Sequence, residues 1–154
     1  MVFVGAPGYS VPGYPEQGAV YLTDATLTQD INFASPHLTL DQEVYTRFGF
    51  AMEVLDINHD GIDDLVVSAP AYGKSSVTQI IDYYAKEYNG RIFVYLGKKD
   101  AGIPKGSKAD FIIRSRDQSD VLMNLGQRLR IGKCNDDKYA DLIILSPLSQ
   151  QGGD

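Results

Sequence analysis

The amino-acid sequence predicts an all-β chain built from repeated units. Runs of roughly four to eight Val, Ile, Leu, Tyr and Phe residues are separated by Gly, Pro, Asn and Asp, which is the composition of strands joined by turns. The same pattern occurs three times along the 154-residue chain. Units of this length do not bury an apolar face alone and need neighbours, as the blades of a propeller do. We therefore expect a fragment of a β-propeller, about two blades long and incomplete at both ends.

The clearest element of the repeat is an apolar strand that ends in Ala-Pro or Ser-Pro. It occurs at residues 2–7, 65–70 and 142–147. A strand that contains a Phe-Gly pair at 48–49 is expected before the second copy, and one that contains a Leu-Gly pair at 125–126 is expected at the same distance before the third. A second strand, led by glycine and rich in aromatic residues, follows at 18–22 and again at 90–96. Each unit therefore combines these strands with an acidic loop and a variable loop.

The spacing of these elements sets the expected unit boundaries. Residues 1–47 form the end of one unit, residues 48–124 a complete unit, and residues 125–154 the start of a third. The first residues read as a strand rather than as a secretory signal, because they carry no charged leader and too short an apolar stretch.

One segment departs from the strand pattern. Between residues 77 and 88, five apolar residues recur at helical spacing, and a capping box formed by Ser76 and Gln79 precedes them. They are Val77, Ile80, Ile81, Tyr84 and Tyr88. This spacing predicts a short amphipathic helix inserted in the variable loop. The alternative is an irregular loop whose tyrosines lie on the sheet.

Composition excludes several classes of function. Twenty acidic residues against 14 Lys and Arg give a net charge of −6, so nucleic-acid binding is disfavoured. No apolar run approaches the ~18 residues of a membrane span. Cys134 is the single cysteine and cannot close a disulfide within the chain. Two histidines, His37 and His59, cannot build a multi-histidine zinc site.

The sharpest chemical signal is the acidic loop at residues 56–64. Side-chain oxygens recur at alternate positions, a glycine that permits a positive φ stands at position 61, and a backbone carbonyl at position 62 is placed to join them. The expected ligands are Asp56, Asn58, Asp60, Ile62 through its carbonyl, and Asp64. Three carboxylates in such a short loop repel one another unless a hard cation neutralises them. The loop therefore predicts one calcium site.

Two other interpretations of this loop are open to test. A solvated acidic turn has the same ordinary turn residues. An EF-hand requires a bidentate Glu at its twelfth position, where this chain has Val67 in a strand. His59 and Asp63 alternate outward from the ligands and are expected to face solvent, and His37 is expected to be a loop residue.

The third unit carries a degenerate copy of the loop. Lys133, Asn135, Asp137 and Asp141 occupy the places of the four side-chain ligands, and Lys138 replaces the glycine. An ammonium at the first ligand position removes one carboxylate and adds a positive charge. We expect no ion there, and instead a bridge from Lys133 to Asp137 and Asp141.

Together these motifs resemble the FG-GAP repeat, which forms the calcium-decorated seven-bladed propeller of integrin α chains. The resemblance rests on the pair at 48–49, the loop at 56–64, and the strands at 65–70 and 90–95. The linking strings at 4–10, 12–13, 47–49, 54–56, 124–126 and 146–147 are similar to the C-terminal propeller of the glycosylphosphatidylinositol-specific phospholipases D. Lys133 and Ser68, the latter in place of a glycine, depart from the family pattern.

The resemblance implies a function without catalysis in this segment. In those phospholipases the chemistry belongs to an N-terminal zinc domain, and no residue here matches it, so no catalytic residue is assigned. The chain is expected to be an extracellular, calcium-binding propeller segment that supports a separate catalytic domain acting on lipid-anchored proteins. The alternative is an integrin-like propeller that binds adhesion ligands, with no enzyme attached. Either interpretation makes the remaining blades its partners.

Overall fold

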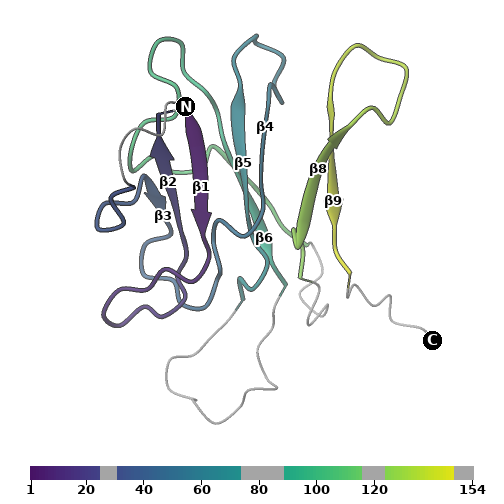
Figure 1. Ribbon diagram of the computed structural model, residues 1–154. Helices are drawn as coiled ribbons and strands as arrows, with labels where there is room; N and C mark the ends of the chain where they lie inside the picture. The colour runs from purple at the N-terminus through teal and green to yellow at the C-terminus, as the bar shows by residue number, and fades with distance from the viewer. Residues whose placement is uncertain (25–30, 74–88, 116–123, 148–154) are drawn as a thin grey trace, which may run out of the picture.

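The computed structural model describes residues 1–24, 31–73, 89–115 and 124–147. Within these ranges the chain forms nine strands and no helix, arranged as three antiparallel sheets that stand side by side (Figure 1). This confirms the all-β prediction and is consistent with a partial β-propeller. The helix expected at 77–88 lies outside the described residues.

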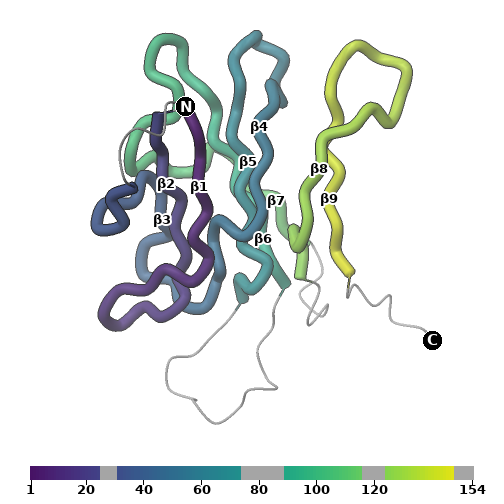
Figure 2. The backbone as a smooth tube through the Cα atoms, viewed as in Figure 1, coloured from purple at the N-terminus to yellow at the C-terminus, as the bar shows by residue number. Residues whose placement is uncertain are grey.

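The second sheet has the complete pattern of a propeller blade. It contains β4 (Met52–Leu55), β5 (Asp64–Ala69), β6 (Arg91–Tyr95) and β7 (Phe111–Ile113), paired in chain order. Every pair is antiparallel, so the backbone runs back and forth as a meander (Figure 2). Four-stranded antiparallel meanders of this kind are the blades of propellers.

The other two sheets are parts of the same pattern. The first contains β1 (Val2–Ala6), β2 (Ala19–Thr23) and β3 (Leu38–Thr39), which correspond to β5, β6 and β7. The third contains β8 (Arg128–Gly132) and β9 (Asp141–Leu145), which correspond to β4 and β5. This arrangement is consistent with the end of one blade, a whole blade and the start of another. The unit limits at 47 and 124 stay predictions.

Two strands were not predicted from the sequence. β3 and β7 have only two and three residues and lie at the far end of their sheets, so they carry too few residues to show an alternating pattern. The Phe-Gly pair at 48–49 was placed in a strand but lies before β4, where it contacts the preceding sheet.

Two separate apolar layers join the sheets. β5 contributes to both because its side chains alternate: Leu65 and Val67 face the first sheet, whereas Val66 faces the third. The layer between the first and second sheets also contains Val20, Leu38, Phe48, Ala69, Phe93, Tyr95 and Ile103. The layer between the second and third sheets contains Leu55, Ile92, Val94 and Leu129. All six residues of β5 are buried, as expected for a strand covered on both faces.

A repeated backbone contact fixes each sheet to the next. A Cβ added to Gly18, which has φ +81°, would lie 2.2 Å from the carbonyl oxygen of Phe48. A Cβ added to Gly90, with φ +74°, would lie 2.4 Å from that of Leu125. Phe48 N–H donates to Gln17, and Leu125 N–H donates to Asn89, at 3.3 and 3.2 Å. We call this contact the glycine joint; it occurs once between each pair of neighbouring sheets.

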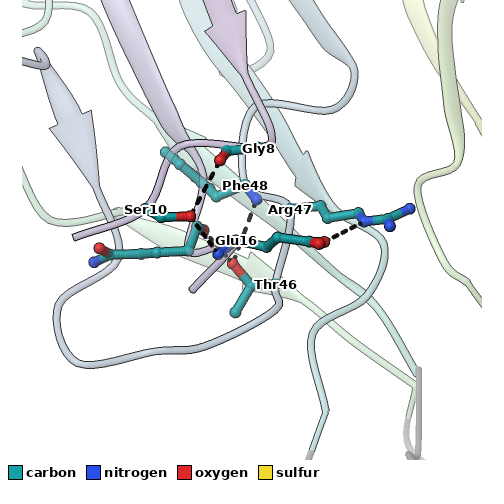
Figure 3. A network of polar contacts seen from close by, with 7 residues as sticks. Gly8, Ser10, Glu16, Thr46, Arg47 and Phe48 are labelled. Carbon is teal, nitrogen blue, oxygen red and sulfur yellow. Dashed lines mark hydrogen bonds and ion pairs between the residues drawn. The ribbon is translucent and has the colours of Figure 1, made fainter. Parts of the chain in front are cut away.

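Polar side chains reinforce the joint between the first two sheets (Figure 3). The buried hydroxyl of Thr46 donates to the carbonyl of Gln17 at 2.6 Å and accepts from Phe48 N–H at 3.3 Å. Arg47 pairs with Glu16 at 3.1 Å, and the hydroxyl of Ser10 accepts from Glu16 N–H at 2.9 Å. The loop between β1 and β2 is thereby tied to the residues that lead into β4.

We predict that Gly90→Ala destabilises the chain by about 2–4 kcal/mol, because the new methyl group adds a backbone clash to an unfavourable φ. Gly106→Ala is the matched control: its φ is +72°, but a Cβ there meets nothing within 4 Å. It should cost only about 1 kcal/mol. Urea unfolding of both variants measures the difference. Equal losses of unfolding free energy in the two variants would show that the close approach to Leu125 does not contribute to the destabilisation.

Candidate metal centre

The acidic loop joins β4 to β5. The corresponding loop of the third unit joins β8 to β9, and both leave their sheets at the same end (Figure 1). Gly61 has φ +85° and His59 has φ +65°, so the chain turns back on itself here. The positive φ that the sequence suggested at Gly61 is confirmed.

Three of the predicted ligands gather around one backbone amide. Asp60 N–H donates to both Asp56 Oδ1 and Asn58 Oδ1, each at 3.0 Å. Asp56 Oδ2 accepts from Gly61 N–H at 2.8 Å, and Asp60 Oδ1 accepts from Ile62 N–H at 2.9 Å. Asn58 also donates its side-chain amide to Asp60 Oδ2 at 2.9 Å. The loop therefore concentrates oxygens of Asp56, Asn58 and Asp60 in one exposed turn.

Asp64 has a different position from the other predicted ligands. Its side chain is fully buried and both carboxylate oxygens accept backbone hydrogen bonds, from Ile57 N–H at 2.9 Å and from Gly97 N–H at 2.8 Å. It therefore links the beginning of the acidic loop to the segment that follows β6. Two backbone donors satisfy a buried carboxylate without any counter-ion. Sequence analysis did not reveal this role, because Gly97 is distant in the chain.

The residues of the loop fit a hard cation in their chemistry. Carboxylate and amide oxygens are the ligands that calcium takes, and backbone donors already hold them in a tight turn. Among the described residues, no group of three or more His, Cys, Asp or Glu side chains is close enough to hold a metal ion. Calcium at this loop therefore stays a prediction, with Asp56, Asn58 and Asp60 as the side chains that lie together.

The third loop keeps part of the same hydrogen-bond pattern. Asn135 accepts from Asp137 N–H at 3.1 Å, Asp137 accepts from Tyr139 N–H at 2.8 Å, and Asp141 accepts from Cys134 N–H at 2.6 Å. These bonds match those of Asn58, Asp60 and Asp64. The two bonds of Asp56 have no counterpart, because Lys133 offers no acceptor.

The bridge expected from Lys133 is not formed. The ion pairs found in the described ranges join Arg47 to Glu16 and Arg130 to Glu53. Lys138 does not have the positive φ of Gly61, so the two backbone paths also differ at that position. The third loop is thus a partial copy, held by its side-chain caps rather than by a central ammonium.

Two histidines have contacts that the sequence did not suggest. The exposed ring of His59 stacks on Tyr139 of the third loop, with centroids 3.6 Å apart and planes inclined by 23°. It therefore joins the two loops instead of only facing solvent, whereas Asp63 is exposed as expected. His37 Nε2 lies 2.6 Å from the carbonyl oxygen of Ile103, across the first two sheets. No sequence signal marks either contact, because each joins different units.

The repeat pattern, the meander and the acidic loop together define an FG-GAP repeat: residues 48–95 match the family model described as "FG-GAP repeat". The chain therefore contains an FG-GAP repeat, which the family model places at residues 48–95.

The chain is similar to phosphatidylinositol-glycan-specific phospholipase D from Homo sapiens, with 36% identity over 97% of this chain and 17% of that protein. The enzyme of the same name from Dictyostelium discoideum is 30% identical over 99% of this chain and 17% of its own length. Integrin alpha-PS3 from Drosophila melanogaster is 33% identical over 64% of this chain and 7% of that protein. The chain thus spans about a sixth of the two phospholipases. In the described ranges, no helix is both long and apolar enough to cross a membrane.

We predict that Asp64→Asn destabilises the chain by about 1–3 kcal/mol, because an amide cannot accept from both Ile57 and Gly97 and would turn its NH2 toward one of these donors. Asp63→Asn, at an exposed neighbouring position, is the control and should have almost no effect. Urea unfolding in EDTA measures both without any contribution from a metal. A variant Asp64→Asn that is as stable as the parent would contradict the linking role.

Proposed function

We propose that this chain is a non-catalytic, calcium-binding segment of an FG-GAP propeller in an extracellular protein, and that it supports a separate catalytic domain. The observation that carries this proposal is its similarity to phosphatidylinositol-glycan-specific phospholipase D over 97% of its length. The substrates in this proposal are proteins held by phosphatidylinositol-glycan anchors. The zinc chemistry expected of such an enzyme would belong to that other domain.

The burial of equivalent residues supports the presence of further blades. Val66 on β5 is fully buried by the third sheet. Its counterpart Ile143 on β9 is 46% exposed, and Leu145 on the same strand is also 46% exposed. Exposed apolar residues on one sheet face indicate a surface that another element covers. A further blade on this face would bury Ile143 in the way that the third sheet buries Val66.

A second function is supported by the similarity to integrin alpha-PS3. In that case the chain is part of an adhesion propeller whose partner is a protein ligand, and no enzyme is attached. The two proposals require different domains elsewhere in the protein. Sequencing the transcript that encodes this segment distinguishes them: an upstream domain rich in His and Asp favours the phospholipase, whereas a downstream membrane span favours the adhesion protein.

We predict that the chain binds one calcium ion at the acidic loop, with a dissociation constant of about 10⁻⁴ to 10⁻³ M, as is typical of extracellular modules. Asp60→Ala should abolish the binding, since Asp60 lies between Asp56 and Asn58. Asp137→Ala, the same change in the third loop, is the matched control and should leave the affinity unchanged. Titration calorimetry provides the measurement. Undiminished binding by Asp60→Ala would exclude this loop as the site.

We also predict that a second site can be created in the third loop. Lys133→Asp combined with Lys138→Gly restores the missing carboxylate and the residue that tolerates a positive φ. The double variant should bind one more calcium ion than the parent and gain thermal stability only when calcium is present. Unchanged stoichiometry in a folded double variant would mean that the partial match between the loops is insufficient for a site.

A further inference from the structure

A cavity of about 580 Å³ lies between the outer strands of the first and second sheets. Its walls come from the segment around β3, from β6 and from the connection that leads to β7. No residue of the acidic loop at 56–64 is among those that line it. Its volume falls within the range of small-molecule sites.

Arg91 supplies a cation to the lining of this cavity. It begins β6 and alternates with Phe93 and Tyr95, which also line the cavity. Its guanidinium carbon lies 3.9 Å above the ring centre of Tyr72. In the described part of the chain it makes no ion pair, and no hydrogen bond to another residue occupies its donors. A guanidinium that lies over an aromatic ring still has N–H donors to offer to an anion.

In the described residues, the Glu43 carboxylate of the cavity lining is hydrogen-bonded to Tyr72 instead of forming an ion pair with Arg91. Tyr72 donates its hydroxyl to Glu43, and both residues line the cavity. Burial, followed by this hydrogen bond, raises the pKa of Tyr72 to about 12. The phenol is therefore protonated at neutral pH and keeps donating to Glu43. Glu43 keeps its negative charge in this hydrogen bond, but within the described residues its carboxylate makes no ion pair with Arg91.

The rim carries groups suited to a polar ligand. Lys108 is exposed and joins Arg91 as a second cation in the lining, and the exposed Asp41 is an acceptor for hydroxyl groups. No ion pair engages either side chain within the residues described. Leu40 and Ile112 add apolar surface to the lining. The cavity lining thus combines cationic, carboxylate and apolar side chains.

We propose that this cavity binds a small acidic saccharide or a similar polyhydroxy ligand, with its carboxylate or phosphate on Arg91 and Lys108 and its hydroxyls toward Asp41. The proposal is independent of the calcium site and of any attached domain, because every residue that it uses belongs to the first two sheets and the loops between them. The cavity proposal can therefore fail while the proposed function holds, and the proposed function can fail while the cavity proposal holds.

Saturation-transfer NMR on the complete chain in EDTA provides the test, with glucuronate, glucose 6-phosphate and neutral glucose as probes. We expect both anionic sugars to bind in the millimolar range and glucose to bind at least tenfold more weakly. The two anions distinguish a carboxylate ligand from a phosphate ligand. Absence of binding by both anionic sugars, or equal binding of glucose, would overturn the proposal.

Variants of the lining residues test whether the anion binds in this cavity. Arg91→Gln should weaken binding of the preferred anionic sugar at least tenfold, and Lys108→Gln should weaken it severalfold. Arg128→Gln, which removes an exposed arginine outside the cavity, is the matched control and should bind as the parent does. Because Lys108 is exposed, its variant tests the site even if Arg91→Gln does not fold. Anion binding that is unchanged in the folded variants at both positions would place the anion elsewhere and contradict the proposal.

Discussion

The close approach of two backbones at the glycine joint governs how the sheets assemble. Gly18 and Gly90 stand where a side chain would overlap the carbonyl of the next unit's Phe48 or Leu125. That contact sets the distance between neighbouring sheets, and the apolar layers fill the space that it defines. Because the same geometry occurs twice with different side chains around it, the backbone contact rather than any one side chain defines the spacing.

Much of the fold could be predicted from the sequence because its determinants are local. β5 and β6 appear as apolar runs bounded by Gly and Pro, and their equivalents in the other units repeat them. β7 could not be predicted, since Phe111 and Ile112 are exposed and the strand exists through its pairing with β6. Ser68 shows another limit of prediction from the sequence. It stands where the family has a glycine, and its hydroxyl accepts a hydrogen bond from Ala51 N–H, just before β4, at 2.9 Å.

The candidate site likewise has one part that could be predicted from the sequence and one part that could not. Alternate spacing was sufficient to place Asp56, Asn58 and Asp60 together, because a tight turn brings alternate side chains to one side. The role of Asp64 depends on Gly97, a residue of the segment that follows β6, and composition alone does not reveal such a partner. The capping bonds shared with the third loop show that the turn is stabilised by its own backbone, so its shape does not require a full set of acidic ligands.

The alternating faces of β5 have a consequence for cooperativity. The second sheet is the only described sheet that belongs to both apolar layers, while the first and third share none of their core residues. Stability in such an array is a sum of each sheet's own contribution and the coupling to its immediate neighbours. Loss of the middle sheet therefore uncouples both ends at once, whereas fraying of a terminal sheet leaves the other interface intact. Hydrogen exchange should accordingly be slowest at the amides of β5 and faster toward either terminal sheet.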